Sequence, residues 1–294
     1  MKVIRVGSRD SALAVAQAKI VMNAITAWDS TAAPRLVTMK TLGDRLLDRP
    51  LESMGGKEVF VKELEQALLE DKVDICVHSL KDMAVSQSPR LPLVAVGLRE
   101  DPRDALILPP GAEEINPERP IGCSSLRRKT QLGVLYPGLK TAPVRGNVLT
   151  RLEKLERGEY GALVLAAAGL KRLSLENRIH TYFPVDRMIP ACCQGILAIQ
   201  GRAGEDTGYL GGFHHPDTWD VMLAERAFLE VLGGGCTSPV AAYATIEEDT
   251  LTIRGYTVDS RGRMYPGEIS GSRRNPGLMG RALAESLKAE AYSI

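Results

Sequence analysis

The sequence shows no excess of charge of either sign and has no long hydrophobic run. Lys and Arg together number 37 and Asp and Glu 36, a formal net charge of +1, which argues against a broad cationic surface for nucleic acid. The longest apolar runs, such as Ala162–Ala168, are far shorter than the roughly 20 residues of a membrane-spanning helix. We therefore expect neither nucleic acid nor a membrane as partner, and any anion site must come from local clusters of Arg and Lys.

Cysteine is also scarce, with five residues that follow no regular spacing. An odd number of cysteines without a framework suits a reducing compartment. The opening stretch "MKVIRVGSRD" lacks the apolar region of a signal peptide, so we expect a cytoplasmic protein. Cys192–Cys193 and His214–His215 are adjacent pairs without the usual chelating spacing, and no metal site is predicted.

What the sequence does contain is an alternation of strand and helix signals. "KVIRV", "LVTMKTL" and "VDICV" read as strands separated by helical segments, and a second series begins at about Asp101. This order is typical of βαβ units in parallel or mixed sheets. After about Thr218 the pattern changes to a helix ending at Gly233, a hairpin turning at Glu248–Asp249, a third strand and a closing helix. We expect two α/β domains and a small α+β domain.

Cations gather at the predicted strand-to-helix junctions, where backbone N–H groups and the positive helix end favour anionic ligands. An arginine fork suits bidentate binding of carboxylate or phosphate. A single surface arginine is most often just a solvated side chain, but several at one kind of junction favour a polyanionic ligand. No Walker phosphate-binding motif is present. The junction residues are Arg9, Ser11, Arg127, Arg128, Arg145, Arg151 and Arg172.

Two further stretches offer chemistry that the residues alone leave open. "VHSLKDM" ends a strand with Ser79, Lys81 and Asp82, which is either a capped turn or a site for proton handling and cation stabilisation. His78 is expected to be a packed histidine. Cys236 follows three glycines and is either a buried small side chain or a reachable thiolate.

Taken together, these stretches resemble the hydroxymethylbilane synthase family, also called porphobilinogen deaminase, along nearly the whole chain. The resemblance rests on many motifs in order, which makes it highly specific. They include "GSRDSALAVAQ", "GGKEVFVKELEQALL", "DICVHSLKDM", "REDPRDAL", "SSLRRKTQL", "RGNVLTRLEKL", "LAAAGLKRL", "CQGILAI" and "ERAFLEVLGGGCTSPVAAYA".

The resemblance implies two α/β domains like those of periplasmic binding proteins around a cleft, plus a small α+β C-terminal domain. The boundaries would fall at residues 1–98 plus 196–216, 101–193 and 219–294. Members of the family join four porphobilinogen molecules head to tail, releasing ammonia at each addition, into the linear tetrapyrrole hydroxymethylbilane. The resemblance therefore implies a monomeric transferase of porphyrin and heme biosynthesis with a small-molecule substrate.

The implied cofactor is a dipyrromethane held by a thioether to the cysteine that matches Cys236, and the glycines before it would present the sulfur. Lys81 and Asp82 match catalytic residues, and the Asp82 carboxylate would stabilise positive charge developing on pyrrole nitrogens. The implied cofactor-binding residues are Ser79, Lys81, Asp82, Ser125, Arg127, Arg128 and Cys236. The implied substrate-binding residues are Arg9, Ser11, Lys57, Arg145, Arg151, Arg172 and Gln194.

The chain departs from the usual family pattern at Cys123, Ala84, Gly161, Cys193 and Gln200. Cys193 replaces a glycine, which matters if that position requires a positive φ. Two other classes compete with the synthase. A non-catalytic anion-binding protein would carry no covalent adduct, and a thiol redox protein would need a resolving cysteine at CxxC spacing, which is missing.

Overall fold

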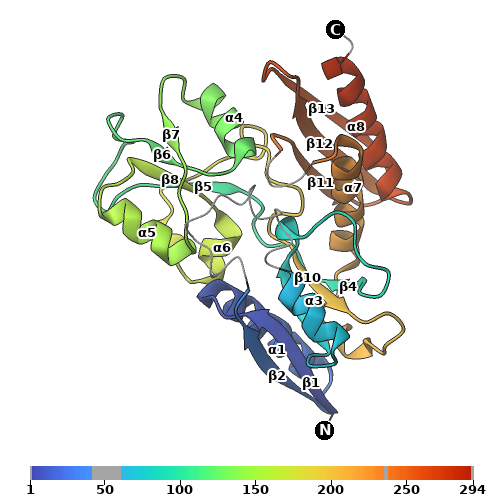
Figure 1. Cartoon of the computed structure of the whole chain (residues 1–294). Coiled ribbons are helices and arrows are strands. Elements are labelled where there is room, and N and C mark those ends of the chain that lie inside the picture. The colour runs from blue at the N-terminus through green and yellow to red at the C-terminus, as the bar shows by residue number, and fades with distance from the viewer. Residues whose placement is uncertain (1, 42–60, 235–237, 293–294) are drawn as a thin grey trace. The chain divides into compact units, whose positions relative to one another are not determined.

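The computed structural model describes residues 2–41, 61–234 and 238–292 of the chain (Figure 1). The chain divides into two compact units, Met1–Glu100 with Ile196–Trp219 and Asp101–Gly195 with Asp220–Ile294. The expected α/β class is confirmed, with a sheet in the first unit and two in the second. The finer division into three domains stays a prediction.

The first unit is built on a five-stranded mixed sheet. Its first three strands in spatial order are parallel, whereas β10 runs antiparallel to both of its neighbours. The chain thus returns from the second unit to insert β10 into the sheet of the first. The spatial order is β2 (Ala32–Met39), β1 (Lys2–Arg9), β3 (Ile75–Ser79), β10 (Leu197–Gly201) and β4 (Leu93–Val96).

Helices of the described segments pack on both faces of this sheet. Because side chains alternate along a strand, Ile75 and Val77 of β3 face the apolar cluster that includes α1 (Ala12–Trp28), whereas Cys76 faces the cluster formed with α3 (Lys62–Leu69). His78 and Gln200 share the parity of Cys76, since Gln200 lies opposite Cys76 in the ladder. A polar pair is therefore placed on the α3 side of the sheet.

The second unit begins with another five-stranded mixed sheet, in which β6 is parallel to β7 and β8 and β5 is antiparallel to β8 and β9. Its strands in spatial order are β7 (Thr141–Ala142), β6 (Ile121–Gly122), β8 (Ala162–Ala166), β5 (Asp104–Ile107) and β9 (Thr181–Tyr182). Apolar side chains of α5 (Val148–Glu156) and α6 (Ala167–Arg172) share a cluster with Ala105 and Ile107, while α4 (Leu126–Leu135) packs with Leu106. Asp104 has the parity of Leu106, which directs it to the α4 side.

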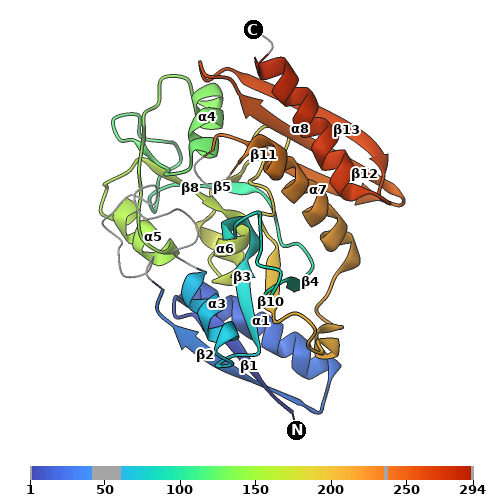
Figure 2. The same cartoon turned by 45° about the vertical axis from the view of Figure 1, so that its right-hand side comes forward.

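The C-terminal part of the second unit is an antiparallel meander with two helices. Figure 2 shows α8 lying along the sheet. The predicted hairpin turn is confirmed, and Glu248 within it has a φ of 54°. The predicted helix end at Gly233 is confirmed as well, with a φ of 62°. The elements are α7 (Pro216–Leu232), β11 (Ala241–Glu247), β12 (Thr250–Val258), β13 (Met264–Ser272) and α8 (Pro276–Tyr292), and short 3-10 helices elsewhere are η3 (Leu80–Asp82), η4 (Glu176–Arg178) and η5 (Gly208–Leu210).

The packing of α8 on α7 depends on Gly280. A Cβ added there would lie 1.9 Å from the backbone oxygen of Ala224, and a backbone atom cannot move aside cheaply. Gly280→Ala should therefore lower the free energy of unfolding by about 2–3 kcal/mol. Gly277→Ala in the same helix is the control, because its added Cβ would meet only the Ala227 Cβ at 3.9 Å. Urea unfolding of both variants checks this, and equal stabilities would contradict it.

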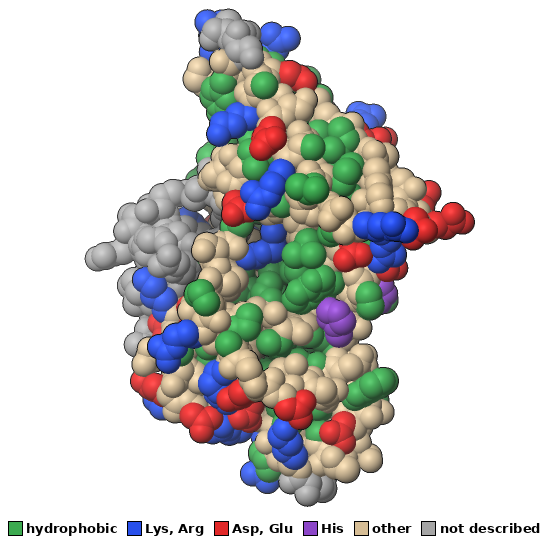
Figure 3. Space-filling model, turned by 90° about the vertical axis from the view of Figure 1, so that its right-hand side faces the viewer, with side chains coloured by type: hydrophobic (Ala, Val, Ile, Leu, Met, Phe, Trp, Pro, Cys, Tyr) green, Lys and Arg blue, Asp and Glu red, His purple; other side chains and the backbone are tan. Residues whose placement is uncertain are grey.

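Charged side chains of both signs are interspersed with hydrophobic ones over the face shown in Figure 3. This distribution fits the net charge of +1 and gives that face no single-sign field for a polyelectrolyte. Among the described residues, none of the helices is both long enough and apolar enough to span a bilayer.

Candidate functional site

In the first unit, the predicted residues gather at one edge of the sheet. Arg9 ends β1 and Ser79 ends β3, and these strands are parallel neighbours, so both ends lie at the same edge. Ser11 caps the N-terminus of α1 by accepting from Ala14 N at 3.4 Å. The hydroxyl of Ser79 accepts from Gln17 Nε2 of the same helix at 2.9 Å. Strand end and helix start are thereby joined.

Lys81 and Asp82 lie on η3, which follows β3 directly. Three contacts of Leu80 hold this turn in place. Its side chain is buried, and its backbone N–H donates to Ile196 O at 3.0 Å. Its backbone oxygen accepts from Met83 N at 3.1 Å. Lys81 and Asp82 themselves are half-buried. A buried anchor therefore holds an ammonium and a carboxylate at the sheet edge, which confirms the predicted strand end and leaves the roles of these residues a prediction.

His78, the residue before Ser79, is a packed histidine as predicted. It is buried, and its Nε2 has no hydrogen-bond partner in the described structure. Burial lowers the pKa of His78 to about 4; the side chain of Gln200 opposes this shift and the positive charge of Arg9 adds to it. His78 is therefore neutral at physiological pH.

The neutral state of His78 makes stability depend on pH. Its pKa in the folded chain lies below the ordinary value of about 6.5, so between those two values the unfolded chain binds more protons. Stability should therefore fall as the pH falls through this window, with His78 contributing on the order of 3 kcal/mol. Urea unfolding from pH 7 to pH 4 should show a shallower loss in His78→Gln than in the wild type. His180→Gln, which removes an exposed histidine, should retain the wild-type profile; a His78→Gln profile as steep as the wild type would contradict the assignment.

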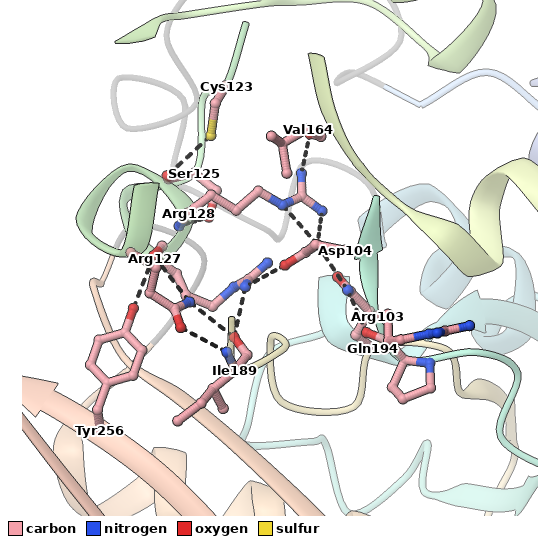
Figure 4. Close-up of polar contacts among 12 residues, drawn as sticks. Arg103, Asp104, Cys123, Ser125, Arg127, Arg128, Val164, Ile189, Gln194 and Tyr256 are labelled. Carbon is pink, nitrogen blue, oxygen red and sulfur yellow. Dashed lines mark hydrogen bonds and ion pairs between the residues drawn. The ribbon is translucent and has the colours of Figure 1, made fainter. Parts of the chain in front are cut away.

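In the second unit, α4 starts at the carboxyl end of β6 and places two arginines in its first turn. Ser125 caps the helix by accepting from Arg128 N at 3.4 Å. Arg127 Nη1 donates to Asp104 Oδ2 at 2.7 Å, and Arg128 donates from Nε and Nη2 to Asp104 Oδ1 at 2.9 and 2.7 Å (Figure 4). The side chains of both arginines are 5% and 9% exposed, and that of Asp104 is fully buried.

Asp104 is the centre of this cluster. Burial on its own would raise the pKa of Asp104, but the charges of Arg127 and Arg128 and their hydrogen bonds lower it well below the usual range. Gln194 adds a hydrogen bond from Nε2 at 3.0 Å and also donates to Pro102 O at 2.7 Å. Two cations thus share one anion, and the cluster keeps a net positive charge.

The arginines retain donors for an anionic ligand. Arg127 uses Nη1 for Asp104 and for Ile189 O, and Arg128 uses Nη1 for Val164 O at 3.0 Å. Within the described part of the chain, Nε and Nη2 of Arg127 have no hydrogen-bond partner. The pair thus combines surplus positive charge with spare guanidinium N–H groups, which fits the carboxylates of a dipyrromethane.

The remaining predicted arginines of this unit lie at separate helix ends. Arg145 is half-buried in the loop before α5, and Arg151 within α5 donates from Nε to Gly146 O at 2.8 Å. Arg172 is the last residue of α6 and donates from Nη2 to Gly195 O at 2.6 Å. Arg145 and Arg151 lie at the start of α5, as expected. The expectation for Arg172 is wrong in this respect, because the residue lies at the C-terminal end of the short helix α6 and not at its start. Lys57 and Cys236 lie outside the described residues.

The sequence analysis did not predict one feature of this unit, Glu225, and predicted another, the backbone of Cys193, only in part. Glu225 on α7 is buried, and its carboxylate accepts from the backbone N–H groups of Cys193 and Ala244, so it ties three segments together. A charged residue on the apolar face of a helix is the signal that could have found it. Cys193 has a φ of 62°, so this position does take the conformation that favours glycine.

The described residues contain no group of three or more His, Cys, Asp or Glu side chains placed to hold an ion. The described residues thus place an ammonium and a carboxylate at a strand end of the α/β sheet in the first unit, and a buried, net-positive arginine pair at the start of α4 in the second.

Comparison with known proteins identifies the family. The model of the porphobilinogen deaminase dipyrromethane cofactor-binding domain matches residues 4–208, and that of the porphobilinogen deaminase C-terminal domain matches residues 219–289. The porphobilinogen deaminase of Acetivibrio thermocellus is 53% identical over 97% of this chain and 98% of its own length. That of Alkaliphilus oremlandii is 52% identical over 98% and 97%. The chain belongs to the porphobilinogen deaminase family and is a transferase.

Solved structures add only a distant likeness. The L-cystine solute receptor of Neisseria gonorrhoeae in its unliganded open conformation matches with a TM-score of 0.38 and 12% identity, over 80% of this chain and 94% of that chain. A similarity this low supports no functional comparison.

Proposed function

We infer that the chain is a hydroxymethylbilane synthase. It joins four porphobilinogen molecules head to tail into hydroxymethylbilane. At each addition the aminomethyl C–N bond of the incoming unit breaks, a C–C bond forms to the free pyrrole carbon of the unit already bound, and ammonia leaves. Water supplies the terminal hydroxyl at release. The observation that carries this conclusion is the full-length family match together with the intact "SLKDM" and "SSLRR" stretches.

We propose that a dipyrromethane is bound through a thioether to Cys236. When bound, it supplies the pyrrole carbon to which the first substrate unit is joined. Arg127 and Arg128 would hold its carboxylates with the donors that Asp104 leaves available, and Ser79, Lys81, Asp82 and Ser125 would complete the cofactor site. A non-catalytic receptor would need neither the carboxylate of Asp82 nor a thiol behind glycines.

We assign proton handling to the strand end of the first unit. The carboxylate of Asp82 would stabilise positive charge on the pyrrole nitrogens as ammonia leaves and as the new bond forms, and it would accept the displaced proton. Lys81 would bind a substrate carboxylate beside it. Each pyrrole unit carries an acetate and a propionate, so a growing chain gathers carboxylates that need several cations. We propose Arg9, Ser11, Lys57, Arg145, Arg151, Arg172 and Gln194 as their partners.

The direct test is incubation of the purified protein with porphobilinogen. Ammonia and hydroxymethylbilane should form in a ratio of four to one. Binding of porphobilinogen without release of ammonia would instead select the non-catalytic reading. We further propose that the protein is a cytoplasmic monomer, and light scattering of the purified chain would test its oligomeric state.

Replacing arginines of the two groups is expected to block different stages of the reaction. Arg127→Gln or Arg128→Gln should impair assembly of the cofactor, because these side chains are the cations of the buried cluster. Arg145→Gln, Arg151→Gln and Arg172→Gln should more often stall later chain growth. Intact mass of the enzyme during turnover measures the enzyme-bound intermediates. Arg157→Gln, which removes an exposed arginine paired with Glu159, is the control. An intermediate distribution identical to that of the wild type in all five variants would refute the division.

A further inference from the structure

Tyr256 joins the C-terminal sheet to the helix that carries the arginine pair. It lies in β12, opposite Ala241 of β11 and Pro266 of β13. It is the largest of the fully buried side chains in the described structure. Its hydroxyl donates to the backbone oxygen of Arg127 at 2.9 Å, as Figure 4 shows. A phenol in the C-terminal segment therefore contacts the first turn of α4.

The Arg127 backbone is otherwise held by few side-chain contacts. Gln131 Nε2 reaches the same oxygen at the longer distance of 3.4 Å and makes its shorter bond to Ile189 O at 3.0 Å. The guanidinium of Arg127 donates to Ile189 O as well. The hydroxyl of Tyr256 thus makes the shortest of the described side-chain bonds to this carbonyl, at the residue whose guanidinium keeps donors beyond those that bind Asp104 and Ile189.

The hydroxyl of Tyr256 acts as a hydrogen-bond donor throughout the physiological pH range. Burial raises the pKa of Tyr256, an effect that the charge of Arg127 only partly offsets. The phenol therefore stays protonated across the physiological range. Because a carbonyl can only accept, the direction of the bond is fixed, and its geometry constrains the rotation of the first turn of α4.

We propose that Tyr256 is a positioning residue for cofactor binding: its hydroxyl sets the first turn of α4, and with it the Arg127 guanidinium, against the C-terminal segment that follows Cys236. This role rests on the proposed function. It assigns to the C-terminal sheet a part in shaping the carboxylate site.

The test removes one oxygen atom. Tyr256→Phe keeps the ring that fills the core. The matched control is Tyr265→Phe in the neighbouring strand β13, which removes a hydroxyl that donates to Asp259 Oδ2 at 3.3 Å. Intact mass gives the fraction of purified protein that carries a covalent dipyrromethane. We expect at least a twofold lower fraction in Tyr256→Phe, with turnover per loaded molecule nearly unchanged, and a wild-type fraction in Tyr265→Phe. A wild-type fraction in Tyr256→Phe, or an equal loss in both variants, would overturn the proposal.

A double-mutant cycle separates positioning from general stability. Arg127→Lys keeps a cation beside Asp104 but removes the planar guanidinium with its several N–H donors. If Tyr256 acts through Arg127, adding Tyr256→Phe to Arg127→Lys should lower the loaded fraction less than it does in the wild type. Equal losses in both backgrounds would mean that Tyr256 only supports the fold. The wild-type control keeps the two proposals distinct, since a wild type without adduct or turnover would refute the function rather than the role of Tyr256.

Discussion

Asp82→Asn is expected to lower the turnover of porphobilinogen by about 10²–10⁴-fold. The amide occupies the same space on η3 but can neither carry the negative charge that stabilises a pyrrole cation nor accept a proton. The anchor of the turn is the buried side chain of Leu80 and the backbone bonds around it, so the fold should persist. Steady-state kinetics combined with urea unfolding of the same preparation measures both effects.

A matched control for Asp82 is available in the same unit. Asp29 follows the C-terminal end of α1 and bonds to Thr31, and α1 runs back from the edge where Asp82 lies. Asp29→Asn removes one carboxylate from the opposite end of the sheet and should leave turnover within a small factor of the wild type. Near-normal activity in folded Asp82→Asn would remove Asp82 from the chemistry.

The second large effect is expected at Asp104. Asp104→Asn leaves two guanidinium groups, 5% and 9% exposed, without a compensating anion. Loss of one partner from a buried ion pair typically costs about 3–5 kcal/mol, and urea unfolding should show a loss of this size. Because Asp104 also orients Arg127 and Arg128, the fraction of protein that carries the dipyrromethane should fall with it.

Asp220→Asn provides the comparison. Asp220 pairs with Arg273 at 2.7 Å in the same unit, but the two side chains are 26% and 23% exposed. A pair with this much solvent access is typically worth about 1 kcal/mol or less. Similar losses of stability in the two variants would contradict the view that Asp104 is the buried counter-ion of the arginine pair.

Local patterns in the sequence predicted much of the fold. The predicted hairpin turn at Glu248–Asp249 joins β11 to β12, which pair as antiparallel neighbours. Gly233 ends α7 because glycine takes a positive φ without strain. The glycine that Cys193 replaces was expected to matter through φ, and Cys193 indeed has a φ of 62°.

Local patterns could not predict contacts between residues that lie far apart in the sequence. Asp104 appeared in the sequence only as part of "REDPRDAL", because its partners lie 23, 24 and 90 residues away. The insertion of β10 as an antiparallel strand depends on how the chain returns between units. Interactions of this kind are fixed by the fold as a whole, and no spacing along the sequence encodes them.

The most direct test of the account is the intact mass of the purified protein, followed by peptide mapping. The account predicts an added mass equal to one dipyrromethane, located on the peptide that contains Cys236 and absent from Cys236→Ser, which should also be inactive. Cys193 is the nearest rival as attachment point, although it is buried. Protein without added mass, an adduct on the peptide containing Cys193, or full added mass in Cys236→Ser would contradict the account.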